Sequence, residues 1–166
     1  MEGYAKTVYL GLGSNLGDRE SFIEKAIAAL EEAGIRIVRR SPLYETAPVG
    51  TPAGRWFLNC VVEAETDLMP LGLLRRTQKI ERRLGRRPPA APQPLGRTID
   101  IDILLFGTGT VNLPELVIPH PRMTERRFVL EPLQTIAPGL RHPVTRLSSA
   151  EMLGLLGPGH AVRRVG

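Results

Sequence analysis

The stretch that decides the fold of this chain runs Arg97-Thr98-Ile99-Asp100-Ile101-Asp102-Ile103-Leu104-Leu105-Phe106. Isoleucine and threonine at this density favour a β-strand over a helix. Because side chains alternate between the two faces of a strand, Thr98 and the two aspartates are expected on one face. The three isoleucines are then expected on the other face. The sequence therefore predicts a strand with one acidic and one apolar face.

Two aspartates one residue apart on a strand place their Cβ atoms about 6.5–7 Å apart. Carboxylates at this distance repel each other unless a positive charge lies between them. Where phosphates are handled, that charge is usually Mg²⁺. The alternative is a strand whose acidic face is simply solvated. The apolar run from Ile103 to Phe106 argues against it, since an exposed edge strand rarely continues in this way. We therefore expect Asp100 and Asp102 to line a cleft at one end of a mostly buried strand.

Length and composition are those of an ordinary globular protein. The 166 residues are 42% apolar and 23% charged, which predicts one domain over residues 1–166. Cys60 is the one cysteine, so no intrachain disulfide can form. The N-terminus has no secretory signal pattern, and no apolar run approaches the ~20 residues of a membrane span. We expect a cytoplasmic protein with no membrane contact.

The formal net charge of +5 comes mostly from arginine, with 19 arginines against three lysines. Arginine binds phosphate through two parallel hydrogen bonds, which lysine cannot do. A general compositional bias toward arginine would give the same total, so the positions are more informative. The arginines that flank the aspartate pair are Arg82, Arg83, Arg86, Arg87 and Arg97 before it and Arg122, Arg126 and Arg127 after it. Two aspartates, a metal and several arginines together indicate a phosphate site.

Hydrophobic periodicity predicts the order of the elements. Strands are expected at 7–12, at 35–45 with an interruption at Pro42, at 56–65 and at 97–106. Helices are expected from the N-cap Asp18 to Gly34 and from Pro70 to Leu84, with Gly85 as the C-cap. The order strand, helix, strand, strand, helix, strand predicts an α+β fold, a ferredoxin-like βαββαβ sandwich with C-terminal additions.

The C-terminal additions are predicted to be short. Strand-like segments occur at 110–113 and 116–118, followed by a short helix through Phe128 and Leu130 that Pro132 breaks. Ser148 or Ser149 can cap a last helix through Leu156. Residues 157–166 are expected to be frayed. Four prolines make 87–96 a mobile loop, for which a lid over the cleft and an inert surface insertion both remain open.

The strand at 56–65 carries Phe57 and Asn59 on its less apolar face. A ring and an amide in this arrangement can stack on and hydrogen-bond a flat heterocycle. Packing of Phe57 against a neighbouring helix is the more common alternative. The glycine-rich turn from Gly11 to Asp18 matches neither nucleotide-binding pattern, so a tight strand-to-helix turn is the simpler interpretation there.

Six separated motifs, in order, resemble the 6-hydroxymethyl-7,8-dihydropterin pyrophosphokinase family of folate biosynthesis. They are Leu10-Gly11-Leu12-Gly13-Ser14-Asn15-Leu16-Gly17-Asp18, Ser41-Pro42-Leu43-Tyr44-Glu45-Thr46-Ala47-Pro48, Phe57-Leu58-Asn59, Gln78-Lys79-Ile80-Glu81 with Gly85-Arg86, the aspartate strand from Gly96 to Phe106, and Pro119-His120-Pro121-Arg122-Met123 continuing to Leu133. The resemblance implies an ATP-dependent diphosphotransferase. Such an enzyme moves the terminal diphosphate of ATP to the hydroxymethyl group of the pterin and releases AMP.

The same resemblance implies a role for each matching residue. Asp100 and Asp102 would hold two Mg²⁺ ions, and Arg86 and Arg97 would neutralise the phosphate chain and act in catalysis. The residues implied in pterin binding are Asn15, Thr46, Val49, Phe57, Asn59 and Phe128. Those implied in ATP binding are Gln78, Glu81, Arg86, Arg97, Ile103, His120 and Arg126.

Two other functions remain possible from the residues alone. One is a Mg²⁺-dependent nucleotidyl- or phosphotransferase of another specificity. The other is a basic nucleic-acid-binding module on the same fold, which would need aromatic side chains on exposed strands. Only 5% of the residues are aromatic, which disfavours the second. The expected partners are ATP and the pterin, without nucleic acid, and the chain is expected to be a monomer.

Overall fold

The computed structural model describes residues 5–47, 55–85, 96–157, 159 and 162–165. The strands are β1 (Lys6–Ser14), β2 (Ile35–Arg40), β3 (Leu43–Thr46), β4 (Phe57–Thr66), β5 (Asp100–Phe106), β6 (Val111–Leu113), β7 (Leu116–Ile118) and β8 (Val162–Val165). The helices are α1 (Arg19–Glu32), α2 (Pro70–Arg83), α3 (Arg127–Ile136), α4 (Ser149–Leu155) and a 3₁₀ turn, η1 (Met123–Glu125). These residues form a mixed α/β structure with an antiparallel sheet and four α-helices.

The main sheet has the strand order β5-β1-β4-β3-β8. β2 pairs with the same edge of β4 as β3 does, farther along β4. β2 and β3 follow one another along β4 because Ser41 and Pro42 interrupt the strand predicted at 35–45. The Ser41 hydroxyl accepts a hydrogen bond from the Val61 amide at 2.9 Å, which keeps that donor paired at the interruption. β6 and β7 form a separate hairpin, as the short strand-like segments predicted.

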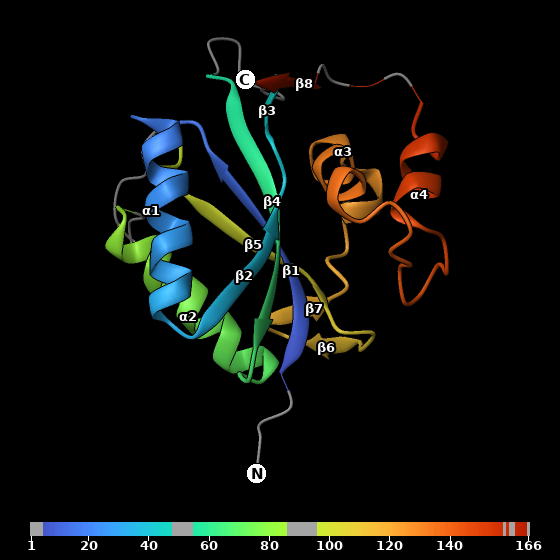
Figure 1. The fold of residues 1–166 in the computed structure, drawn as a ribbon, viewed down its shortest axis with the longest axis horizontal. Helices are drawn as coiled ribbons and strands as arrows, with labels where there is room; N and C mark the ends of the chain where they lie inside the picture. Colours follow the sequence, from blue (N-terminus) through green and yellow to red (C-terminus); the bar gives the residue numbers. More distant parts are fainter. Residues whose placement is uncertain (1–4, 48–54, 86–95, 158, 160–161, 166) are drawn as a thin grey trace.

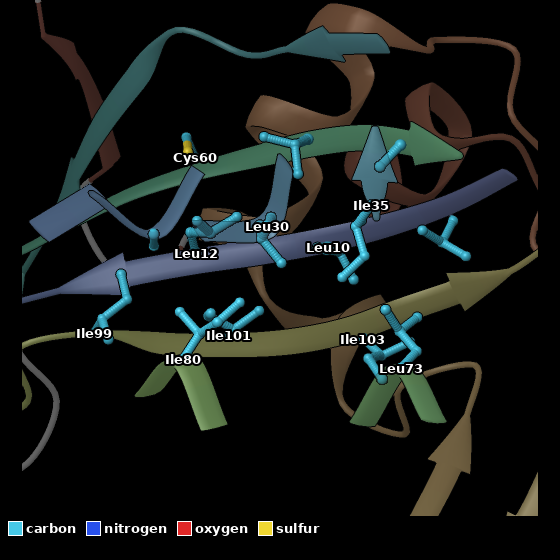
Figure 2. Close-up of a cluster of buried hydrophobic side chains, with 14 of the residues drawn as sticks. Leu10, Leu12, Leu30, Ile35, Cys60, Leu73, Ile80, Ile99, Ile101 and Ile103 are labelled. Carbon is cyan, nitrogen blue, oxygen red and sulfur yellow. The ribbon is translucent and has the colours of Figure 1, made fainter. Parts of the chain in front are cut away.

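The helices cover the sheet from both sides (Figure 1), with α1 and α2 on one face and α3 and α4 on the other. The larger core lies under α1 and α2. There β1 contributes Leu10 and β5 contributes Ile101 and Ile103, all buried (Figure 2). The apolar face predicted for the aspartate strand is therefore confirmed.

The predicted N-cap Asp18 is confirmed, whereas the C-cap of α2 is Leu84 and not the predicted Gly85. The Asp18 carboxylate accepts a hydrogen bond from the Ser21 amide. Gly85 follows the C-cap of α2 with φ +114°, a conformation that glycine adopts without strain.

Thr98 corrects one detail of the prediction, because regular pairing of β5 begins only at Asp100. The Thr98 side chain does not continue the acidic face. It packs toward the end of α2, where its Oγ1 lies 3.4 Å from the position of a Cβ built on Gly85. Bends at Gly96 and Thr98 set this direction.

The helix α3 also differs from expectation. It begins at Arg127 and continues through Pro132 to Ile136, so the predicted break at Pro132 is wrong. A proline inside a helix removes one hydrogen bond. Here the apolar stripe of α3, with Val129, Leu130 and Leu133 buried against the sheet, outweighs that loss.

The predicted fraying of 157–166 is wrong for Val162–Val165, which form β8 and extend the sheet beyond β3. Sequence periodicity cannot reveal a four-residue strand whose partner lies more than a hundred positions earlier. The predicted cap of α4 is confirmed, because Ser148 and Glu151 form a reciprocal capping box. In the part of the chain that the structure describes, no helix has the length and apolarity to cross a membrane.

Candidate active site

A cleft lies on the α3 side of the sheet, where the side chains of β1, β4 and β5 change from apolar to small or polar. Under α3 and α4 this face carries the buried side chains of Tyr9, Val61 and Leu104. Farther along the same strands, alternation brings small or polar residues to that face. The resulting cavity of about 250 Å³ is lined by Gly11, Leu12, Gly13, Thr46, Ala47, Phe57, Asn59, Cys60, Val61, Asp100, Asp102, Arg126, Phe128 and Val129.

The aspartate pair lies in this cleft, as the sequence predicted, with side chains 27% and 29% exposed for Asp100 and Asp102. A guanidinium approaches each carboxylate. Arg97 Nη1 lies 3.1 Å from Asp100 Oδ1, and Arg126 Nη1 lies 3.8 Å from Asp102 Oδ2. Two carboxylates and two guanidinium groups therefore lie in or next to the cleft.

Aromatic and amide groups also line the cleft. Phe57 and Phe128 both line it, from β4 and α3, and the Arg126 guanidinium lies 5.4 Å from the centre of the Phe128 ring. The Asn59 amide donates a hydrogen bond to Thr46 Oγ1 at 2.8 Å. This bond fixes the amide orientation and leaves the Asn59 carbonyl oxygen as an acceptor on the side of Gly13.

Gly13 is a site residue that the sequence did not single out. A Cβ built on Gly13 would lie 2.7 Å from Asn59 Oδ1, so a side chain at this position would displace the Asn59 amide. The neighbouring Gly11 lines the same cleft. Their spacing of two on a strand is a readable signal for a shared face. Their partner Asn59 becomes apparent only from the pairing of Gly13 with Asn59 across β1 and β4.

Asn15 lies beside this cleft and holds the residue that precedes the aspartate strand. Its backbone amide donates to the Arg97 carbonyl at 3.0 Å, and its side-chain Oδ1 accepts from the Arg97 amide at 2.7 Å. Gly96 permits this approach, since a Cβ on Gly96 would lie 2.6 Å from Asn15 Oδ1. The two hydrogen bonds fix the main chain from which the Arg97 guanidinium reaches Asp100.

His120 is attached to the outer edge of β5. Its backbone amide donates to the Leu104 carbonyl at 2.9 Å, and its Nδ1 accepts from the Arg122 amide at 3.2 Å. Burial, with a further contribution from the Arg126 guanidinium, lowers the pKa of His120, and the Asp100 carboxylate opposes this shift. The neutral ring with Nδ1 as acceptor carries its proton on Nε2 and can donate from there.

The other predicted ATP-binding residues lie outside the lining of the cleft. Gln78 is exposed on α2, whereas Glu81 is buried and accepts a hydrogen bond from the Ile101 amide at 2.8 Å. The Ile103 side chain is only 5% exposed and belongs to the core under α1 and α2. Arg86, Val49 and positions 87–95 of the predicted mobile loop lie outside the described residues.

Comparison with known proteins gives a consistent result. Residues 9–138 match the 7,8-dihydro-6-hydroxymethylpterin-pyrophosphokinase (HPPK) family. The chain is 46% identical over 129 residues to 2-amino-4-hydroxy-6-hydroxymethyldihydropteridine pyrophosphokinase of Bacillus subtilis, covering 77% of this chain and 76% of that protein. Identity to the protein of the same name from Aquifex aeolicus is 44% over 140 residues, or 84% of this chain and 86% of that protein.

A solved structure of Plasmodium falciparum HPPK-DHPS with pteroate superimposes with a TM-score of 0.73 at 19% identity. The match covers 93% of this chain and 43% of the Plasmodium chain, so the present chain spans less than half of that protein. At this identity the likeness concerns the fold. The match over residues 9–138 and the 46% identity to the Bacillus subtilis protein show that this chain belongs to the 7,8-dihydro-6-hydroxymethylpterin-pyrophosphokinase family.

Proposed function

We propose that this chain transfers the terminal diphosphate of ATP to 6-hydroxymethyl-7,8-dihydropterin in the described cleft. The hydroxymethyl oxygen forms a bond to the β-phosphorus, and the bond from that phosphorus to the oxygen bridging the α-phosphorus breaks. AMP leaves with the bridging oxygen, and the hydroxyl proton passes to solvent. The observation that carries the proposal is the juxtaposition of Asp100 and Asp102 with Phe57, Asn59 and Phe128 in one cavity. This pyrophosphokinase role is that of the family to which the chain belongs.

Asp100 and Asp102 are the residues proposed to hold Mg²⁺. Among the described residues no group of three or more histidine, cysteine, aspartate or glutamate side chains could enclose a metal ion. A pair of carboxylates nevertheless fits Mg²⁺, which commonly binds through one or two carboxylates and completes its octahedron with phosphate oxygens and water. When bound, the metal supplies positive charge that stabilises the phosphate oxygens during transfer.

Arg97 and Arg126 are proposed to bind and orient the phosphate chain. Each guanidinium lies next to one aspartate in the cleft, so each can exchange part of that contact for a phosphate oxygen. Fixed cations at this position stabilise developing negative charge without reorganisation during the reaction. We extend the same role to Arg86, which the family motif assigns and which lies outside the described residues.

The flat pterin ring is proposed to bind between Phe57 and Phe128. The two rings line the same cavity from different elements, and offset stacking on aromatic rings is favourable for a flat heterocycle. The Asn59 carbonyl oxygen is oriented by the bond from its amide to Thr46 and can accept an N–H of the pterin. For Val49, the family motif alone supports the proposed contact with the pterin. Asn15 is assigned to the support of Arg97 near the pterin.

On the nucleotide side we propose direct contacts for His120 through its Nε2–H. For Ile103 we propose a contact through the main chain, because its side chain is buried in the core. Ile103 lies on the outer edge of β5 between two main-chain groups that Glu81 and His120 already bind. Gln78 is exposed on α2 and can contact ATP from that edge, whereas Glu81 is proposed to support β5.

The direct test is incubation of the protein with ATP, Mg²⁺ and 6-hydroxymethyl-7,8-dihydropterin. We expect AMP and the pterin diphosphate in equal amounts, with neither ADP nor free phosphate as the main product. Each product is quantified by anion-exchange chromatography. Formation of ADP would show single phosphoryl transfer instead, and failure of folded protein to form AMP would exclude the proposed reaction.

We also infer a ferredoxin-like arrangement in a single, monomeric domain. With β2 and β3 counted as one interrupted strand, the order of the elements is strand, helix, strand, strand, helix, strand. The sheet order β5-β1-β4 followed by β2 and β3 supports this description. Size-exclusion chromatography with light scattering measures the molar mass in solution and so tests whether the chain is a monomer.

A further inference from the structure

Glu45 joins two arginines that come from opposite ends of the chain. Its Oε2 lies 3.0 Å from Arg19 Nη1 at the start of α1, and its Oε1 lies 3.2 Å from Arg163 Nη2 on β8. The Glu45 side chain is only 16% exposed. The carboxylate therefore links α1, β3 and β8 at one corner of the sheet. β8 lies beside β3 at that corner (Figure 1).

Trp56 is held by the same two arginines. The Arg163 guanidinium lies 4.6 Å from the centre of the Trp56 ring, and Arg19 Nη1 donates to the Trp56 carbonyl at 2.9 Å. A guanidinium over an aromatic face is attracted by the ring quadrupole. The ring and the main chain of Trp56 are thus fixed from two directions.

Both held residues directly precede residues of the cleft. Glu45 precedes Thr46, and Trp56 precedes Phe57, while Thr46 and Phe57 pair across β3 and β4. On the other edge of β3, Val162 pairs with Thr46. The cluster of Arg19, Glu45, Trp56 and Arg163 therefore fixes the main chain on either side of the pair Thr46 and Phe57.

We propose that Arg163 is a positioning residue for the pterin side of the cleft. It acts through Glu45 and Trp56, neither of which is assigned to a substrate. The inference rests on the proposed assignment of Thr46 and Phe57 to the pterin. Arg163 lies beyond the residues 9–138 that match the family, so this role belongs to the C-terminal strand of this chain. A loosened Phe57 would have to be ordered when the pterin binds, which weakens binding and leaves the chemical step unchanged.

The experiment compares Arg163→Ala with Arg164→Ala in the 166-residue chain. The two variants remove the same charge from adjacent positions of β8, and Arg164 alternates to the strand face opposite Glu45 and Trp56. We expect Arg163→Ala to raise the KM for the pterin about fivefold, with kcat and the KM for ATP within about twofold of wild type. Arg164→Ala should leave all three values unchanged.

Two further variants keep the test decisive. Arg163→Lys retains the charge beside Glu45 and loses planar stacking on Trp56, so its KM for the pterin should fall between wild type and Arg163→Ala. Phe57→Ala separates this inference from the proposed function. If Phe57→Ala does not raise the KM for the pterin, the assignment of the pterin site is wrong. If it does and Arg163→Ala does not, only the role of Arg163 is overturned.

A general structural role is also distinguishable. It would lower kcat and raise both KM values together in Arg163→Ala, in step with a fall in melting temperature. That pattern would overturn the proposal. A rise confined to the KM for the pterin, together with partial rescue in Arg163→Lys, would support it.

Discussion

The two faces of β1, β4 and β5 differ in what their side chains do. Toward α1 and α2, β1, β4 and β5 present a continuous apolar surface that is buried along its length. Toward α3 and α4, one end of the same three strands carries buried apolar side chains, and the other end carries Gly13, Phe57 and Asp100 in the cleft. One face therefore carries the core, whereas the other is divided between core and candidate active site.

This difference between the two faces explains how the cleft accommodates two carboxylates that repel each other. On the α1 and α2 side, buried apolar side chains along the whole face stabilise the sheet. The carboxylates of Asp100 and Asp102 lie at the open end, where solvent and the flanking guanidinium groups limit the cost of their charge. Substitutions on the two faces should therefore separate stability from activity.

The largest effect is expected at the aspartate pair. Asp100→Asn and Asp102→Asn should each lower kcat about a thousandfold, equivalent to ~4 kcal/mol of transition-state stabilisation. The melting temperature should stay within about 2 °C of wild type, because both side chains are partly exposed. AMP release and differential scanning calorimetry measure the two quantities. The matched control is Asp67→Asn, an exposed aspartate after β4, which should change neither quantity.

The opposite pattern is expected on the core face. Leu10→Ala removes a fully buried side chain and should lower the free energy of unfolding by about 2–5 kcal/mol. The residual folded protein should keep kcat close to wild type, since Leu10 points away from the cleft. Urea unfolding and AMP release at 20 °C or below, roughly the range of maximum stability, provide the comparison. A thousandfold loss of kcat in folded Leu10→Ala would show that the two faces are not separable.

A smaller effect is expected where β1 approaches β4. In Gly13→Ala the new methyl group would meet Asn59 Oδ1 at 2.7 Å, so the Asn59 amide must move. The KM for the pterin should rise about tenfold to a hundredfold, a range that corresponds to ~1.4–2.7 kcal/mol. Initial rates at varied pterin concentration measure it. Gly139→Ala, where a Cβ would meet no heavy atom within 4 Å, is the control.

The smallest effect concerns pH. Because the pKa of His120 lies below its ordinary value of 6.5, His120 should be neutral at pH 7, and the KM for ATP should not change through His120 between pH 8 and 6.5. The unfolded chain takes up this proton at higher pH than the folded chain. Stability should therefore fall as the pH decreases through 6.5. NMR titration, assigned with His120→Gln, measures the pKa, and a midpoint above 6.5 would contradict the burial argument.

Local pattern was sufficient to predict most of the elements and the acidic face of β5. Asp18, Gly85 and the interruption at Pro42 mark element ends through local backbone chemistry, which the sequence contains directly. The predicted helix break at Pro132 is wrong because burial of α3 against the sheet outweighs the local preference of proline against helix.

Long-range pairing could not be predicted from pattern. The Asn15 side chain reaches Arg97 across 82 positions, and β8 reaches β3 across more than a hundred. Neither contact leaves a periodic signal in the chain. The resemblance to the family supplied the candidate residues, but it did not distinguish those that line the cleft, such as Phe57, from those that support it, such as Glu81.

The central claim is that Asp100 and Asp102 hold the metal at the open end of the face covered by α3. Titration of Mn²⁺ by electron paramagnetic resonance, with a non-hydrolysable ATP analogue present, tests it without turnover. We predict that wild type with the analogue binds Mn²⁺ at least about tenfold more tightly than the analogue alone, a difference of ~1.4 kcal/mol. Asp100→Asn combined with Asp102→Asn should abolish that difference. Equal Mn²⁺ affinity in wild type and the double variant would contradict the account.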